Sequence, residues 1–338
     1  MGSFVLSCES TADYPRSFFE ARGIEYIMFH YELDGVVHED DLYQSVTPEA
    51  FFGALKAGST SKTSQVSVGE YTEFWKPMLE AGKDVLHLTL SSGISGTYNS
   101  AVIAARDLEA QYPDRTVRVV DSLAASAGYG LLMDYLADMR DAGATFDEAA
   151  SWAEEHKLNV NHWFFVSDLD CLKRGGRVSS TSALLATALK ICPVMNVDYQ
   201  GKLIPREKIR TKKKAIAELV KNMMAHVENG AAYTGKCSIS HSACREDAEE
   251  VARLIGEQIP ALKGNIAINN IGTVIGSHTG PGTVALFFMG VSASISERAA
   301  ARQLASRAAS HARVAGRCHA NSIFLDAMVL PPSASGIW

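Results

Sequence analysis

The alternation of short β-rich runs with longer segments of helical period is the feature that most constrains the fold of this sequence. Four apolar runs in the first half predict strands, at Phe4–Cys8, Tyr26–His30, Val85–Leu90 and Val117–Val120. Segments with one apolar face lie between and after them and predict helices, at Pro48–Leu55, Val68–Ala81, Thr97–Glu109 and Ser126–Asp141. Stacked β-α units favour a mostly parallel sheet covered on both faces. The sequence therefore predicts a three-layer α/β/α domain with a parallel sheet.

The second half of the chain has a different pattern. Its predicted strands are His162–Val166, Pro193–Val197, Lys236–His241 and Ile266–Ile275, and its predicted helices are Thr211–Val227 and Glu246–Gln258. This order indicates a two-layer α/β domain with a mixed sheet. Thr145 and Glu148 form a candidate capping box, which predicts a helix through about Lys157. We place the domain boundary after this helix, with residues 1–158 in the first domain and 159–290 in the second.

Composition excludes several classes of function. The formal charge of −6 and the pI near 5.9 give no general attraction to nucleic acid. The six cysteines form no C-x-x-C pair, and no histidine or cysteine set has the spacing of a metal site. The longest apolar stretch, Val284–Val291, is too short to span a bilayer, and no signal peptide is recognisable. These observations predict a cytoplasmic protein with reduced thiols, no metal and no cofactor.

The segment Val85–Ser100, VLHLTLSSGISGTYNS, carries the clearest functional pattern. An apolar strand runs into a turn rich in glycine and hydroxyl groups, and then into a helix. Ligands of open α/β sheets bind at the carboxyl ends of strands, and the free N–H groups of a helix start favour an anion. Ser95 and Thr97 could add hydroxyl donors. An equally strong reading is that either residue only caps the helix.

Two further loops could reach the same crevice. Ser59–Ser67 (STSKTSQVS) is rich in hydroxyls and brings Thr63 and Ser64, although each residue by itself is more typical of a polar loop. Gly276–Gly282 (GSHTGPG) places His278 and Thr279 after an apolar run predicted as a strand. A lone histidine is more often structural than functional, but its ring N–H can bind a carboxylate. Together the loops suggest a small pocket of neutral donors without a fixed arginine.

Six segments in order resemble the signatures of the DegV family. They are ESTADYP (9–15), TSQVS (63–67), LSSGISGTYNSA (90–101), VVDS (119–122), LKRGGRVS (172–179) and IGSHTGPGTV (275–284). The resemblance covers about residues 3–290 and implies a DegV-like two-domain fold with a long-chain fatty acid bound between the domains. In FakB-type members, the acid is presented to a separate fatty acid kinase, which makes the acyl-phosphate. A non-catalytic carrier is the implied role.

The resemblance also implies roles for individual residues. Thr63 and Ser95 would bind the carboxylate with help from the Gly96 amide, and His278 would line the head-group site. Ser64, Thr97 and Thr279 complete the predicted ligand-binding set. The segments Ala183–Leu189 and Phe164–Val166 are candidates for the lining of an acyl tunnel. One departure stands in the first signature, where Glu9 occupies a position at which aspartate is common.

Two other functions stay open on the sequence. The first is a serine hydrolase that uses Ser95 and His278, because Gly93-Ile94-Ser95-Gly96 resembles a nucleophile elbow, although Thr97 stands where glycine is needed. The second is a regulatory module that senses a lipid.

Two basic segments are candidates for interaction surfaces. Arg206–Lys214 (REKIRTKKK) could dock a kinase or contact a membrane surface transiently, but a solvated helix start is the commoner role of such a charge run. The tail 291–338 matches neither domain. We expect it to be helical or disordered, and its five arginines are more typical of a solvated helical face than of a binding surface.

Overall fold

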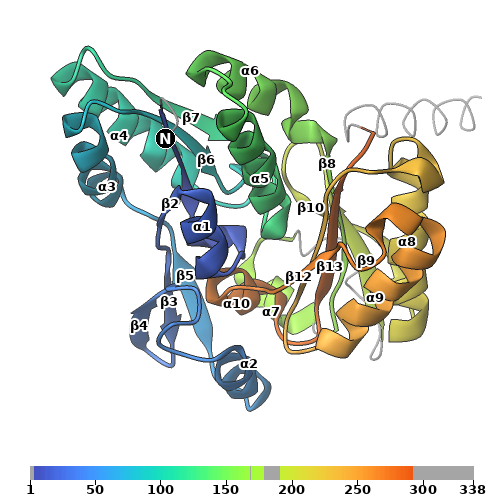
Figure 1. The fold of residues 1–338 in the computed structure, drawn as a ribbon. Coiled ribbons are helices and arrows are strands. Elements are labelled where there is room, and N and C mark those ends of the chain that lie inside the picture. Colours follow the sequence, from blue (N-terminus) through green and yellow to red (C-terminus); the bar gives the residue numbers. More distant parts are fainter. Residues whose placement is uncertain (1–3, 168, 179–190, 292–338) are drawn as a thin grey trace, which may run out of the picture. The chain divides into compact units, whose positions relative to one another are not determined.

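The computed structural model describes residues 4–167, 169–178 and 191–291. Its first sheet has four strands in the order β2-β1-β6-β7, and every pairing is parallel. Helices α3 and α4 cover one face, and α5 and α6 cover the other (Figure 1). The predicted three-layer arrangement with a parallel sheet is therefore confirmed. The elements are β1 (Phe4–Glu9), α1 (Arg16–Arg22), β2 (Ile24–Ile27), α3 (Val68–Glu80), β6 (Asp84–Thr89), α4 (Thr97–Gln111), β7 (Val117–Asp121), α5 (Ala127–Asp141) and α6 (Phe146–His156).

Local signals in the sequence account for most of these boundaries. The Thr145 hydroxyl accepts from the Glu148 amide and the Glu148 carboxylate accepts from the Thr145 amide, so the predicted capping box begins α6. Ser67 and Glu70 make the same reciprocal pair at the start of α3. The predicted strand Tyr26–His30 is wrong as one element. β2 ends at Ile27, and His30 begins a strand of another sheet.

That other sheet is small and was not predicted. It consists of β3 (His30–Leu33), β4 (Val36–Glu39) and β5 (Ser61–Ser64) in the order β4-β3-β5, with both pairings antiparallel. Helix α2 (Pro48–Lys56) lies in the connection between β4 and β5. The segment that the sequence suggested as a polar loop is thus a strand that pairs with β3. Its pairing sets the position of Thr63, which lies opposite Tyr31.

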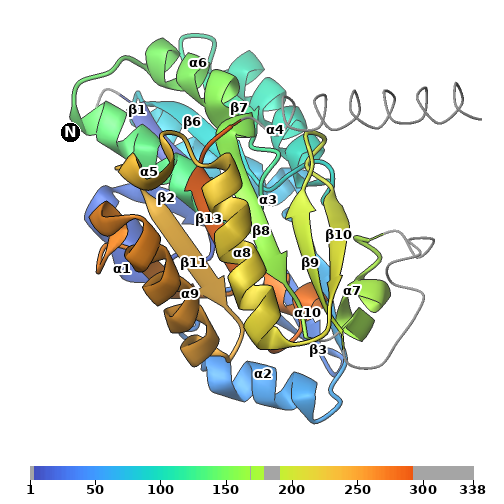
Figure 2. The same ribbon diagram turned by 90° about the vertical axis from the view of Figure 1, so that its right-hand side faces the viewer.

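The third sheet is mixed and has six strands in the order β10-β9-β8-β13-β11-β12. Helices α8 and α9 pack on one face of it (Figure 2), whereas α5 contacts strands β8, β11 and β13. The expected mixed sheet is confirmed, while the boundary near residue 158 stays a prediction. The elements are β8 (Val160–Phe165), α7 (Leu169–Gly175), β9 (Cys192–Val197), β10 (Leu203–Ile209), α8 (Lys212–His226), β11 (Cys237–His241), α9 (Arg245–Gln258), β12 (Ala267–Asn270), α10 (Thr273–Thr279) and β13 (Val284–Met289).

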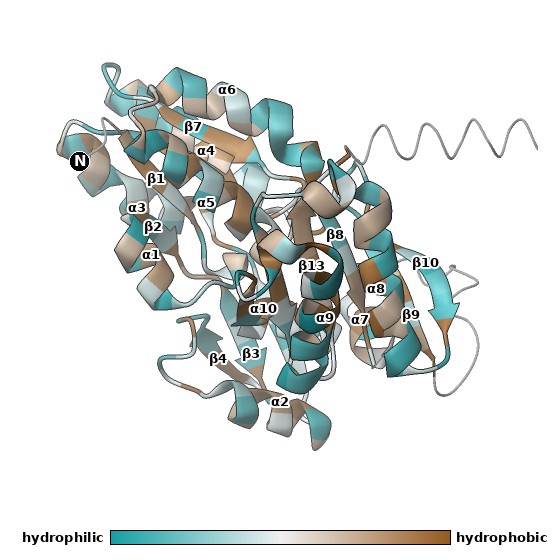
Figure 3. Cartoon of the chain, turned by 45° about the vertical axis from the view of Figure 1, so that its right-hand side comes forward, coloured by the Kyte–Doolittle hydropathy of each residue, from teal (hydrophilic) through white to brown (hydrophobic). Residues whose placement is uncertain are grey.

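Strand β13 is the most apolar part of the mixed sheet (Figure 3). It pairs antiparallel with both β8 and β11, so its backbone is bonded on both sides. Its side chains alternate between two cores. Leu286 and Phe288 pack with α8 and α9, and Ala285 and Phe287 belong to the core that also contains the parallel sheet. A continuous apolar run is the expected signature of a strand buried on both faces.

The predicted strand Ile266–Ile275 is wrong in its second half. β12 ends at Asn270, and α10 begins at Thr273 after the N-cap Gly272. His278 and Thr279 therefore lie on a short helix, not at the end of a strand. The predicted tunnel segment Ala183–Leu189, Ser179 of the fifth signature, and the tail from residue 292 lie outside the described residues.

Candidate ligand-binding site

A cavity of about 340 Å³ lies between the parallel sheet's turns, the small sheet and the inner face of β8 and β13. This volume is within the range of small-molecule sites in proteins. Its apolar lining residues are Phe29, Leu90, Ile94, Ala125, Phe164, Val197, Leu203, Ile271, Val274, Ile275, Ala285 and Phe287. Its polar lining residues are Thr63, Ser64, Gln65, Ser95, Ser126, His162, Arg177, His278, Thr279 and Thr283.

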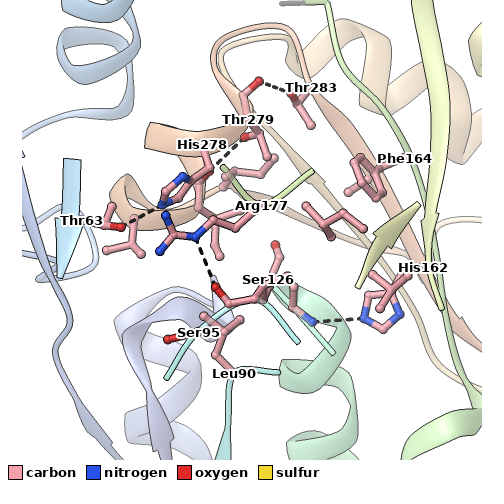
Figure 4. A pocket seen from close by; sticks show the side chains of 18 of the residues that line it. Thr63, Leu90, Ser95, Ser126, His162, Phe164, Arg177, His278, Thr279 and Thr283 are labelled. Atoms are coloured by element: carbon pink, nitrogen blue, oxygen red, sulfur yellow. Dashed lines mark hydrogen bonds between the residues drawn. The ribbon is translucent and has the colours of Figure 1, made fainter. Parts of the chain in front are cut away.

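Thr63 and His278 form the centre of a polar cluster at one side of this cavity. The Thr63 hydroxyl lies 2.8 Å from His278 Nε2, although these residues come from β5 and α10 (Figure 4). Burial, with a smaller effect of the Arg177 charge, lowers the pKa of His278 to about 4. The ring is therefore neutral at pH 7. A neutral imidazole has one N–H group, which can donate to the Thr63 hydroxyl or to a bound carboxylate.

Ser95 lies on the turn between β6 and α4 and lines the cavity. Its hydroxyl oxygen accepts from the Thr97 amide at 3.2 Å, so it also satisfies one free N–H of the helix start. The capping and ligand-binding interpretations of this residue are thus compatible. The turn is held in place by Ser91, which donates to Gly201 O at 2.8 Å and accepts from the Gly93 amide at 3.0 Å.

Arg177 corrects the expectation of a pocket without a fixed arginine. Its Nε donates to Ile94 O at 3.2 Å and one terminal nitrogen donates to Gly175 O at 2.6 Å. In Figure 4 the side chain lies between His278 and the turn that carries Ser95. Two backbone carbonyls therefore hold a cation beside the neutral donors. The LKRGGRVS signature contained this residue, but sequence reasoning gave it no role in the cavity.

Two predicted ligand-binding residues do not line the cavity. The Thr97 side chain is fully buried, and its hydroxyl lies 2.7 Å from the Tyr71 hydroxyl and 3.4 Å from Glu9 Oε1. Gly96 is next to the cavity because a Cβ at this position would lie 2.5 Å from Gln65 Oε1. The end of the Gln65 side chain would have to move to admit a larger residue there. Ser64 and Thr279 do line the cavity, and the Thr279 hydroxyl donates to Ile275 O at 3.1 Å.

His162 is a second buried histidine of the cavity wall that sequence reasoning missed. Its Nε2 accepts from the Ala125 amide at 3.2 Å, so Nδ1 carries the proton and donates to Val160 O at 3.1 Å. Gly128 is required beside it, since a Cβ there would lie 2.2 Å from Nε2. Both ring nitrogens are thus bonded to the backbone. The position in the predicted strand His162–Val166 gave no signal of this role.

The buried His162 ring makes stability fall at acid pH. Burial lowers the pKa of His162 to about 4 from an ordinary value of 6.5. Between these two values the unfolded chain binds the proton and the folded chain does not, so stability decreases as pH falls from 6.5 to 4. We expect this histidine to contribute about 3 kcal/mol to that loss. Urea unfolding of wild type and His162→Asn at several pH values measures it, and equal slopes for both proteins would contradict the assignment.

The hydrolase interpretation lacks the geometry of a triad. His278 Nε2 is bonded to Thr63 and not to Ser95, and its buried Nδ1 has no hydrogen-bond partner in the described part of the chain. A catalytic histidine needs a group that orients it. Within the same ranges, no cluster of three or more histidine, cysteine, aspartate or glutamate side chains could hold a metal ion. No helix there is long and apolar enough to cross a membrane.

Comparison with known proteins decides the family. Residues 4–290 match the family described as "Uncharacterised protein, DegV family". The chain belongs to the DegV family. A DegV domain-containing protein of Clostridium perfringens is 40% identical over 290 residues, which cover 86% of this chain and 98% of the relative.

Solved DegV structures share the fold. A DegV family protein from Thermus thermophilus, described as binding fatty acid, has a TM-score of 0.76 and 27% identity, and covers 86% of this chain and 100% of its own. A Thermotoga maritima protein described as having a fatty acid binding function has a TM-score of 0.73 and 31% identity over the same shares. The DegV fold with its parallel and mixed sheets is thus established for this sequence.

Proposed function

We propose that this DegV protein binds a long-chain fatty acid with its carboxylate at Thr63, Ser95 and His278, and presents it to a separate fatty acid kinase. One observation carries the first part of the proposal: in a mostly apolar cavity, Thr63, His278 and Arg177 lie close together near the turn of Ser95. A fatty acid has the same division into a charged head and an apolar chain. Members of the family with known structures are described as binding fatty acids.

The energetics are adequate for retention of a lipid. Burial of about sixteen methylenes at about 0.8 kcal/mol each supplies on the order of 10 kcal/mol before ordering costs. Hydrogen bonds to an ionised carboxylate are stronger than those between neutral groups. Thr63 and Ser95 would then fix the head, while the hydrophobic effect supplies most of the affinity. Arg177 adds a favourable charge at the same side.

Native mass spectrometry with lipid extraction tests the binding. We expect the purified wild-type protein to carry a fatty acid at a stoichiometry near one, and Thr63→Ala/Ser95→Ala to bind it about 100-fold more weakly, because two charge-assisted bonds of about 1.5 kcal/mol each are lost. Thr60→Ala/Ser92→Ala is a matched control outside the cavity lining. A wild-type protein that is empty and takes up no added fatty acid would reject the proposal. Ester hydrolysis that depends on Ser95 would favour the hydrolase instead.

The second part of the proposal, presentation of the fatty acid to a kinase, depends on the basic residues exposed at the start of α8. Lys213 and Lys214 are exposed, whereas Lys212 is paired with Asp247 at 2.7 Å. Basic residues in the first turn oppose the helix dipole, so glutamates in their place should not weaken the helix. With a fatty acid kinase and ATP, we expect Lys213→Glu/Lys214→Glu to form acyl-phosphate at least tenfold more slowly, with lipid content unchanged. Lys221→Glu on the same helix is the control. Equal rates for all three proteins would remove this surface from the proposal, and lipid binding without any turnover would favour a lipid-sensing module.

A further inference from the structure

The hairpin of β9 and β10 forms part of the cavity wall. Val197 ends β9 and Leu203 begins β10, the two residues pair with each other, and both line the cavity. β10 is the edge strand of the mixed sheet, and β9 is its neighbour in that sheet (Figure 2). Leu203 is also partly exposed. At this edge, one side chain therefore reaches both the cavity and the solvent.

The turn of this hairpin is held together by its own hydrogen bonds. Asp198 Oδ1 accepts from the Gln200 amide at 2.9 Å and from the Lys202 amide at 2.8 Å. The Asp198 carbonyl accepts from the amide of Gly201, which has φ 71°, at 2.9 Å. An aspartate that binds backbone amides further along the chain is a common way to fix a turn. The turn is thus preorganised and would move as one unit.

The tip of the hairpin packs on two turns at the carboxyl edge of the parallel sheet. The Ser91 hydroxyl donates to Gly201 O at 2.8 Å. A Cβ on Gly201 would lie 1.9 Å from Ser91 Oγ and 3.1 Å from Leu123 Cα, and a Cβ on Gly93 would lie 2.5 Å from Gln200 O. The glycines therefore allow the backbones to approach closely, and the Ser91 hydroxyl supplies a hydrogen bond across the contact.

The backbone of Ser91 is fixed independently of the hairpin. Its amide donates to Ala124 O at 3.0 Å, and its carbonyl accepts from the Ser95 amide at 3.1 Å. The residue is fully buried and follows Leu90, which lines the cavity. Loss of the hydroxyl would leave these two backbone bonds in place. It would remove the bond that joins the turn of Ser95 to the hairpin.

We propose that Ser91 is a positioning residue that fastens the β9–β10 hairpin over the cavity, and that fatty acid enters and leaves beneath this hairpin. The proposal rests on the proposed function, because it assigns a route to the bound fatty acid. With the bond to Gly201 made, Val197 and Leu203 close the route. When it breaks, the hairpin moves outward and carries both residues with it.

This arrangement acts on rates more than on affinity. The bond between Ser91 and Gly201 stabilises the closed hairpin whether or not a lipid is present. Its loss therefore makes opening easier in the lipid-free and in the lipid-bound protein alike. Both entry and exit of the fatty acid should become faster, as expected when a lid limits both steps. A residue that only contributes to affinity would change the dissociation rate and leave the association rate as it is.

Stopped-flow exchange of a fluorescent polyene fatty acid with phosphatidylcholine vesicles tests the proposal. In Ser91→Ala, we expect the association and dissociation rates both to rise about tenfold, with the dissociation constant within about twofold of wild type. Gly93→Ala should act in the same way, because its methyl group would press on the hairpin backbone while the backbone of residue 93 suits alanine. Ser238→Ala removes a fully buried hydroxyl on β11, outside the cavity lining, and should follow wild type.

Two outcomes of this experiment would overturn the proposed route. One is faster dissociation of Ser91→Ala with an unchanged association rate, since Ser91 would then contribute to affinity alone. The other is wild-type rates in both Ser91→Ala and Gly93→Ala.

Hydrogen exchange of the lipid-free protein separates this proposal from the proposed function. The amides of residues 200–202 should exchange about tenfold faster in Ser91→Ala and Gly93→Ala than in wild type and Ser238→Ala. That result would support the positioning role of Ser91 even if no fatty acid bound, and the failure would then belong to the proposed function. Equal exchange in all four proteins would reject the positioning role.

Discussion

Replacement of Glu9 by alanine is expected to lower the free energy of unfolding by about 5 kcal/mol. The Glu9 carboxylate is fully buried and accepts from the Tyr71 hydroxyl at 2.7 Å and from the Leu90 amide at 2.9 Å. The Thr97 hydroxyl adds a longer contact. Alanine leaves the Leu90 amide without an acceptor, and of the Tyr71 and Thr97 hydroxyls, which are bonded to each other, one also loses its acceptor. Each unpaired buried donor costs about 1–3 kcal/mol. Urea unfolding measures the loss.

The matched control for this variant is Glu20→Ala. Glu20 is exposed and pairs with Arg16 on one turn of α1, so its loss should cost less than about 0.5 kcal/mol. Comparable losses for Glu9→Ala and Glu20→Ala would contradict the anchoring role of Glu9. Since Leu90 and Thr97 flank the turn that carries Ser95, folded Glu9→Ala protein should also bind fatty acid more weakly. The glutamate at this aspartate position thus serves as an internal acceptor, not as a ligand.

Adjacent phenylalanines on β8 are expected to respond differently to truncation. Phe165 is fully buried in the core beneath α8 and α9, and Phe165→Ala should cost about 4 kcal/mol of stability. Phe164 points to the opposite face of the sheet and lines the cavity. Phe164→Ala should cost less, because the new space joins an existing cavity. It should instead shift the bound lipids toward longer or branched chains.

Unfolding curves and lipid profiles of the two variants provide the measurement. The two substitutions remove the same atoms one residue apart, so each serves as the control for the other. A Phe165→Ala protein with a changed lipid profile and normal stability would show that the two faces of β8 are not separate. The same alternation predicts that Phe287 belongs with Phe164, and Leu286 with Phe165.

Local patterns made much of the fold predictable from the sequence. Apolar strands such as β1 and β6, and the reciprocal caps at Thr145 and Glu148, depend on residues close in the chain. The elements that were predicted wrongly depend on contacts with residues far away in the chain. β5 is polar throughout and is a strand only because it pairs with β3, about thirty residues earlier. α10 begins where Asp40, more than 200 residues away in the chain, accepts from Thr273.

The residues of the candidate site also divide into those that local sequence patterns predicted and those that depend on tertiary contacts. A hydroxyl-rich segment indicated Thr63 and a glycine-rich turn indicated Ser95, and both residues line the cavity. Thr97 was grouped with them because it follows Ser95 so closely, but the first turn of α4 directs its hydroxyl to Glu9. Arg177, Ser126 and His162 were not predicted as lining residues, because only tertiary contacts bring them to the cavity.

The polar cluster draws its residues from segments far apart in the chain: Thr63 from β5, Ser95 from a turn, Arg177 from the segment after α7 and His278 from α10. An unfolded chain has no such site, so a bound ligand adds its free energy to the native state alone. A ligand at 1,000 times its dissociation constant would raise the free energy of unfolding by about 4 kcal/mol. The melting temperature of a purified batch would therefore report the fraction of protein molecules that carry ligand. Two preparations of one sequence could differ in stability without any difference in covalent structure.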